Sequence, residues 1–295
     1  MTKHTSLFIN PFSSDTSYEE RLFFWLRFSL LGCFVGHGFW GLVTKKGWIP
    51  FFEVFFIDSS TAFALMPLVG IMDIMVGIIA FVYPTRVLLL WASFWTLFTA
   101  ALRPSAGMGM SEFFERAGNF GVPLLFLGLY GIPATFHYRQ WFTKLKPLSD
   151  LTFSQGYFLE CLMRLSLLSL LVGHGGLCVF MKHQVVARNL SILGITEVYG
   201  LQYFGLFEIA LGLVACLKPR LSWILPFVGV YKLTSELLFP VAGVPMDIFE
   251  TIERMGDYII PIILLQYYRS PYYQKGQTSS HSSGVYADRA YPFQH

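Results

Sequence analysis

Eight runs of about twenty mostly apolar residues dominate the sequence, and any fold must keep them away from water. A helix of about 20 apolar residues crosses the hydrocarbon core of a bilayer. The runs are Leu22–Val43, Thr61–Tyr83, Arg86–Leu102, Phe113–Phe136, Phe158–Met181, Tyr199–Leu217, Leu221–Phe239 and Phe249–Tyr267. Only 13% of the 295 residues are charged, against roughly 25% in soluble domains. We therefore expect an all-α integral membrane protein with eight transmembrane helices.

The loops indicate how such a chain is oriented. Eleven Lys and Arg residues fall on the side of the two termini, and five fall on the opposite side. Because basic loops stay in the cytoplasm, both termini are predicted to be cytoplasmic, in a bacterial-type inner membrane. Two loops on the other side, around 48–56 and 191–199, are apolar enough to lie on the membrane or to fold back onto the helices.

Three motifs occur twice in the same order, at offsets of 135 to 138 residues. The pairs are Arg27 to Gly38 with Arg164 to Gly175, Gly70-Ile-Met-Asp73-Ile-Met-Val-Gly77 with Gly205-Leu-Phe-Glu208-Ile-Ala-Leu-Gly212, and Glu115-Arg116-Ala-Gly118-Asn119 with Glu253-Arg254-Met-Gly256-Asp257. Such self-similarity indicates a duplication. Since each unit has an even number of spans, the two four-helix repeats must be parallel.

The repeat also predicts the organisation of the chain. Residues 1–21 form a cytoplasmic tail, 22–140 the first four-helix repeat and 141–157 a cytoplasmic linker. Residues 158–268 form the second repeat. The Tyr-, Ser- and Gly-rich residues 269–295 are expected to be a mobile cytoplasmic tail.

Charged and polar residues inside the apolar runs are the candidate ligand-binding residues, because each is costly in a bilayer without a partner or a water-filled site. In the first half these are Arg27, His37, Asp73, Glu115, Arg116 and Asn119, and in the second half Arg164, His174, Glu208, Lys232, Glu236, Glu253, Arg254 and Asp257. His37, His174, Asp73 and Glu208 are the candidates for proton transfer. In each half we expect the His, the acid and the Glu-Arg pair to line one internal cavity. The alternative is that all these groups are structural ion pairs that lock the helices together.

The halves differ at one pair of positions. Lys232 and Glu236 stand four residues apart on one helix face, whereas the matching positions of the first half hold Thr96 and Ala100. An ionisable pair is an unusual addition for packing alone. The sequence therefore favours the second half as the more elaborate ligand site.

The sequence argues against metal, dithiol, haem and nucleic-acid sites. The four cysteines lack CxxC spacing, which argues against a structural zinc site or a dithiol, and no metal site is expected. A haem is disfavoured because one His per bundle cannot supply two facing ligands. The net charge of +3 and the dispersed basic residues indicate no nucleic-acid partner.

The Gly-flanked His after an Arg, the acid within Gly-x-x-[Asp/Glu]-x-x-x-Gly and the Glu-Arg-x-Gly motif together resemble the DoxX/DoxD-like four-helix membrane family. The resemblance covers 22–136 and again 158–267, so the chain is similar to a tandem duplication of that unit. It implies a quinone-linked oxidoreductase assembly, with a quinone as one fitting ligand and redox subunits as partners. Arg116 and Arg254 would then hold an anionic substrate or fix the carboxylates. The chain differs from the usual single unit by being doubled.

Three functions follow from these patterns. The first is a multi-pass membrane protein that binds a small molecule within its helix bundle, in quinone-linked redox chemistry. The second is a transporter of small molecules or ions, which parallel repeats and intramembrane charges also suit. The third is a non-catalytic assembly subunit whose polar groups are all structural.

Overall fold

The computed structural model describes residues 9–135, 137–181, 184–217 and 222–274, and throughout these ranges the regular structure is helical. The helices of the first half are α1 Tyr18–Leu42, α2 Ile49–Glu53, α3 Ser59–Val82, α4 Arg86–Ser105, α5 Met110–Glu115 and α6 Ala117–Tyr130, followed by α7 Tyr138–Phe142. The second half contains α8 Phe153–Gly176, α9 Gln184–Ser191, α10 Val198–Leu217, α11 Ile224–Glu236, α12 Leu238–Ala242, α13 Ile248–Glu253 and α14 Met255–Tyr268. Short helical turns cover Lys46–Trp48, Leu177–Met181 and Pro245–Asp247.

Six helical segments of the described chain are long and apolar enough to cross a membrane. They are Tyr18–Leu42, Ser59–Val82, Arg86–Ser105, Phe153–Met181, Val198–Leu217 and Ile224–Ala242. The protein is therefore a multi-pass α-helical membrane protein in contact with lipid, as its sequence predicted.

The expected last span of each half is broken into two shorter helices. The break falls at Arg116 between α5 and α6, and at Arg254 between α13 and α14. Both arginines have a φ of −86°, with ψ of 8° and 23°, outside the helical range. A hydropathy pattern averages over many residues, so it registers the apolar length and not a break at one residue.

Local sequence explains where the first helix of each half begins. The Ser17 hydroxyl accepts a hydrogen bond from the backbone N–H of Glu20, and the Glu20 carboxylate accepts one from the backbone N–H of Ser17. Thr152 and Gln155 form the same reciprocal arrangement at the start of α8. Each pair satisfies two backbone N–H groups that the first helical turn leaves without partners.

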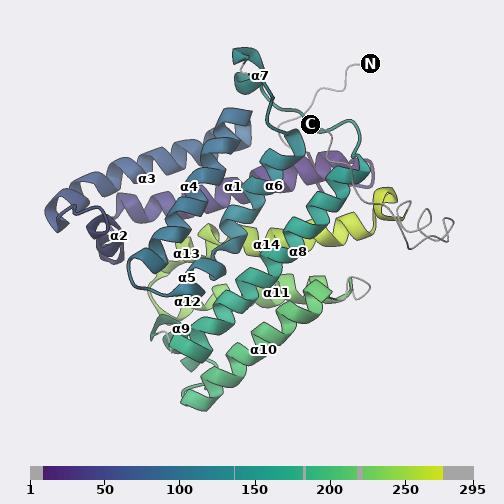
Figure 1. The fold of residues 1–295 in the computed structure, drawn as a ribbon. Coiled ribbons are helices and arrows are strands. Elements are labelled where there is room, and N and C mark those ends of the chain that lie inside the picture. Colours follow the sequence, from purple (N-terminus) through teal and green to yellow (C-terminus); the bar gives the residue numbers. More distant parts are fainter. Residues whose placement is uncertain (1–8, 136, 182–183, 218–221, 275–295) are drawn as a thin grey trace.

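Four helices occupy the middle of the molecule: α1, α6, α8 and α14 pack on one another around the main hydrophobic core. Helix α3 packs on α1 and α4 on α6, while α10 packs on α8 and α11 on α14 (Figure 1). The inner helices are mostly buried, whereas α4 and α10 expose many apolar side chains. Exposed apolar surface of this kind suits contact with lipid.

Glycines set the closest of these contacts. A Cβ atom on Gly38 would lie 2.6 Å from the Gly70 carbonyl oxygen, and one on Gly175 would collide with the Gly205 carbonyl. Real Cβ atoms do not approach that closely, so only glycine lets α1 meet α3, and α8 meet α10, at these distances.

The two halves also interlock. A Cβ atom on Gly36 of α1 would collide with the backbone of Glu253, and one on Gly173 of α8 with the backbone of Glu115. The short helix before each break therefore packs on the first helix of the opposite half, α13 on α1 and α5 on α8.

The described chain starts and finishes at one end of the molecule. The rings of Tyr18 and Tyr272 lie 5.7 Å apart, and Tyr272 donates a hydrogen bond to Glu19. The cytoplasmic location of this end and the domain boundaries stay predictions of the sequence. Residues 1–8 and 275–295 of the two predicted tails lie outside the described residues.

We predict that Gly38→Ala destabilises the protein by about 1–3 kcal/mol, because the Gly70 carbonyl leaves no room for a methyl group. The thermal unfolding midpoint of the purified protein in detergent measures this. Gly47→Ala is the control, since its new Cβ would meet only the Lys45 side chain, at 4.0 Å. Equal midpoints for the two variants would contradict the tight packing of α1 on α3.

Candidate functional site

Each half holds a histidine against a buried acid. His37 Nδ1 lies 2.7 Å from Asp73 Oδ2, and His174 Nδ1 lies 2.6 Å from Glu208 Oε2. Both carboxylates are fully buried. Tyr231 also donates a hydrogen bond to Glu208 over 2.8 Å. Each acid therefore fixes the orientation of its imidazole, and the Nε2 atom faces away from the acid.

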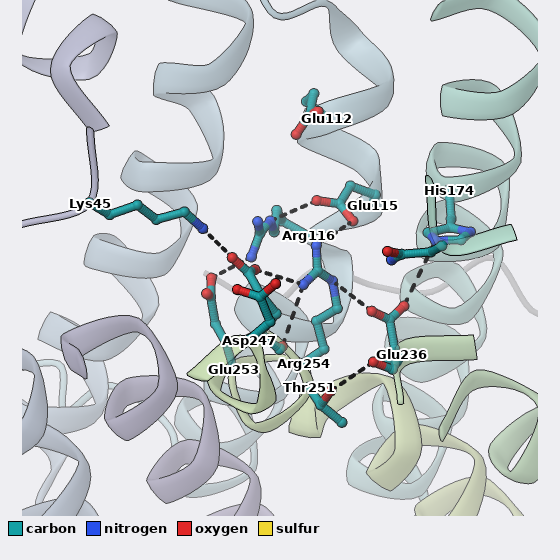
Figure 2. A network of polar contacts seen from close by, with 12 residues as sticks. Lys45, Glu112, Glu115, Arg116, His174, Glu236, Asp247, Thr251, Glu253 and Arg254 are labelled. Atoms are coloured by element: carbon teal, nitrogen blue, oxygen red, sulfur yellow. Dashed lines mark hydrogen bonds and ion pairs between the residues drawn. The ribbon is translucent and has the colours of Figure 1, made fainter. Parts of the chain in front are cut away.

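The Glu-Arg motifs of the two halves exchange partners. Arg116 forms an ion pair with Glu253 of the other half, and Arg254 lies 3.4 Å from Glu115. Arg116 also lies 2.7 Å from its own neighbour Glu115. The breaks in the two last spans bring these side chains together between α1 and α8, in the network that Figure 2 shows.

Four further pairs extend this network. Arg254 lies 3.1 Å from Glu250 and 3.3 Å from Glu236, Glu250 pairs with Lys45, and Glu236 lies 2.7 Å from Lys232. Figure 2 shows Lys45 reaching in from one side and His174 standing near Glu236 on the other. The four cations Lys45, Arg116, Lys232 and Arg254 thus balance four glutamates. Such pairing is what buried charges require in a low dielectric.

A cavity of about 170 Å³ lies beside this network, in the first half. Its polar end holds His37, Asn119, Arg116, Glu253 and Thr96, and Thr99 and Arg103 also line the cavity. The remaining wall is largely aromatic and comes from α1, the 48–57 segment and α4: Phe34, Trp48, Phe51, Phe52, Phe55, Trp95 and Phe98. The cavity thus joins an apolar chamber to a charged end.

The segment that closes the cavity is the apolar loop after α1. Trp48 is buried and its ring stacks on His37, with 4.5 Å between ring centroids. Phe55 is 49% exposed, so the cavity reaches the surface there. Of the two arrangements that the sequence allowed for this loop, the structure shows the one in which it folds back onto the helices.

In the second half, Lys232 and Glu236 stand at the positions that match part of the cavity lining of the first half. Both side chains are completely buried. Thr96 and Ala100, which match them in sequence, line the cavity of the first half instead. His174 Nε2 accordingly faces Glu236 at 3.8 Å, whereas His37 faces the cavity. The cavity thus lies in the first half, whereas the extra ionisable pair led the sequence analysis to favour the second half.

The cavity of the first half is lined by residues of both halves. His37 and Arg116 line the cavity of the first half together with Glu253 of the second. Asp73 stands behind His37 and Glu115 behind Arg116. Asp257 is buried against Gly118 of the other half.

Arg27 and Arg164 are not part of this group. Arg27 donates a hydrogen bond to the Phe81 carbonyl over 2.8 Å, and Arg164 donates one to the Cys216 carbonyl. Those carbonyls belong to the last turns of α3 and α10, where the helix dipole favours a cation. Both arginines tie the end of one helix to its neighbour.

Sequence reasoning missed Lys45, Glu250 and the aromatic wall. A signal for Glu250 was present, because it stands four residues before Arg254 and matches Glu112 of the first half at the offset of 138. Glu112 pairs instead with Arg103 at 2.9 Å. Lys45 gave no such signal, since it lies in a predicted loop.

In the described residues, no group of three or more His, Cys, Asp or Glu side chains is arranged to hold a metal ion. The four cysteines are free, and Cys33 lines the cavity.

The sequence matches no protein-family model, no curated protein and no solved structure. The DoxX/DoxD-like resemblance therefore stays a prediction.

Glu236→Leu should destabilise the protein by about 3–5 kcal/mol, because it leaves Lys232 buried without its carboxylate. Lys232→Met should cost less, since Glu236 keeps Arg254 at 3.3 Å. The double variant should recover most of the loss. Unfolding midpoints of the three variants form the test, and additive losses would show that the two side chains do not act as a pair.

Proposed function

We propose that this membrane protein binds a small ring-bearing molecule in the cavity beside His37. The observation that carries the proposal is the cavity itself, with its aromatic wall and one charged end. A cavity of about 150 Å³ holds one benzene molecule, so 170 Å³ suits one substituted six-membered ring.

The polar end would orient the ligand. His37 is held by Asp73 through Nδ1, so its imidazolium form presents an Nε2–H donor to an oxygen atom of the ligand. Arg116 and Asn119 supply further hydrogen-bonding groups at the same end. Trp48 and Trp95 would contact the ring. Apolar pockets with a few converging polar groups are typical ligand sites.

An apolar ligand would reach the cavity from the bilayer. The exposed Phe55 would mark the opening. Its ring contacts Phe98 of α4, which in turn stacks on the exposed Phe94. A molecule dissolved in lipid would meet apolar side chains at the entrance and charged ones only inside.

The broken helices support eight membrane passages. In this proposal α5 with α6, and α13 with α14, complete the last span of each half, with the charged network filling the break inside the protein. Irregular backbone is tolerated at membrane depth where protein surrounds it. Equivalent contacts in the two halves, such as His37–Asp73 and His174–Glu208, support a duplicated, DoxX/DoxD-like unit. An inner membrane location with cytoplasmic termini belongs to the same proposal.

Quinone-linked redox chemistry is one use of such a site. A benzoquinone ring is of suitable size, and His37 would then hydrogen-bond one quinone oxygen and exchange a proton with it. Redox partner subunits, transport and a purely structural role stay predictions of the sequence, and the binding proposal depends on none of them.

Tryptophan fluorescence of the purified protein tests the binding. Duroquinone and benzamide are suitable probes because both are uncharged single rings, and the fully methylated duroquinone offers no open ring carbon to Cys33. We expect saturable quenching through Trp48 and Trp95. Ala100→Phe, which fills the cavity, should weaken binding at least tenfold.

Leu97→Phe is the matched control, since Leu97 stands on the same helix but is exposed. It should bind like the unaltered protein. Binding of both probes that survives Ala100→Phe would place the ligand elsewhere and contradict the proposal.

A further inference from the structure

The side chain of Glu236 occupies, in the second half, the position that is open in the first. Its carboxylate lies 3.3 Å from Arg254 Nε, 3.8 Å from His174 Nε2 and 2.7 Å from Lys232 Nζ. The two halves therefore offer an internal comparison, with a built-in carboxylate on one side and a cavity on the other.

Three side chains surround the Glu236 carboxylate in the second half, and the first half has counterparts of two of them. His37 matches His174, and Arg116 matches Arg254. Both line the cavity. Ala100 stands where Glu236 would be, so its methyl group leaves the place of the carboxylate vacant.

The residues that differ between the halves are the buried ammonium group of Lys232 and a carboxylate that interacts with it. Thr96 replaces Lys232, and Asn119 replaces Asp257, a carboxylate that acts electrostatically on Lys232. The first half has thus lost the ammonium group together with one of its acidic partners. The groups that remain in the first half, His37 and Arg116, suit an anionic group of a ligand that carries no ammonium group.

Formal charges agree with this reading. At the matched positions the second half has two cations, Lys232 and Arg254, and four carboxylates, those of Glu208, Glu236, Glu253 and Asp257, a net of −2. The first half has Arg116 with Asp73 and Glu115, a net of −1, and Arg103, which also lines the cavity, stands where the second half has the neutral Phe239. The first half is therefore less negative than the second, which leaves room for an anion in its cavity. Glu253 also lines the cavity, but it is paired with Arg116, as Glu115 is paired with Arg254 beside Glu236.

Asn119 gives a separate indication of a polar ligand. It lines the cavity, is only 8% exposed, and its Oδ1 atom has no hydrogen-bond partner. A buried polar atom without a partner is costly. Because the two ends of an amide can exchange places, the Asn119 amide can donate a hydrogen bond to an anionic oxygen.

We infer that the ligand is an aromatic monocarboxylate, whose carboxylate lies between His37 and Arg116 and whose ring lies against the aromatic wall. This inference rests on the proposed binding function and names its ligand class. It selects a charged carboxylate over the neutral carbonyl of a quinone.

Benzoate and benzamide test the inference, because they have the same ring and nearly the same shape and differ in charge. In the fluorescence titration, benzoate should bind at least tenfold more tightly than benzamide. Equal or weaker binding of benzoate, with benzamide binding still lost in Ala100→Phe, would overturn the carboxylate and leave the cavity proposal standing. If neither benzoate nor benzamide nor duroquinone binds, both proposals fail.

A pair of variants tests the anion site without any ligand. Ala100→Glu supplies the carboxylate of the second half, and Ala100→Gln supplies a neutral group of the same size. Ala100→Glu should have the higher thermal midpoint, since His37 and Arg116 receive its charge, and it should no longer bind benzoate. A higher midpoint for Ala100→Gln would contradict the inference.

The reciprocal change should create a second site. The triple variant Lys232→Thr, Glu236→Ala and Asp257→Asn gives the second half the residues of the first. We expect two benzoate molecules per chain by isothermal titration, against one in the unaltered protein. A folded triple variant that still binds one benzoate would show that the matched residues do not define the site. If the triple variant does not fold, the two Ala100 variants still test the inference.

Discussion

The crossed ion pairs between the two halves are the interaction on which the rest of the structure depends. A buried arginine or glutamate without a partner costs several kcal/mol. Here Arg116 pairs with Glu253, and Arg254 with Glu115, so buried ion pairs join the two halves. These pairs require the last span of each half to break at the arginine. They also require glycines at Gly36 and Gly173, where the broken helices meet α1 and α8.

Hydropathy and the cost of buried charge were sufficient to predict the helical membrane fold and most members of the polar network. They were not sufficient to predict partners. Depth along the membrane places His37 near the Glu-Arg motifs, but it does not say that Glu253, from the other half, would share its cavity. The breaks at Arg116 and Arg254 were missed because an apolar run looks the same whether or not one residue leaves the helix. Lys45 was missed because its partner Glu250 is 205 residues away in the chain.

The difference between the halves is more informative than their likeness. Lys232 and Glu236 were read from the sequence as signs of a ligand site, and the structure shows them buried and paired with each other. The same volume in the first half is lined by Thr96 and Ala100 and is open. Small neutral residues, which attract no attention in a sequence, therefore line the cavity, whereas the conspicuous charges at the matched positions are buried and paired.

The most direct measurement is an experimental structure of the protein with 4-iodobenzoate, in which anomalous scattering locates the iodine. The account predicts the iodine among the aromatic side chains near Trp48 and Trp95, with the carboxylate between His37 and Arg116. Iodine found only on the outer, lipid-facing surface, with the cavity beside His37 unoccupied at saturating ligand, would contradict it.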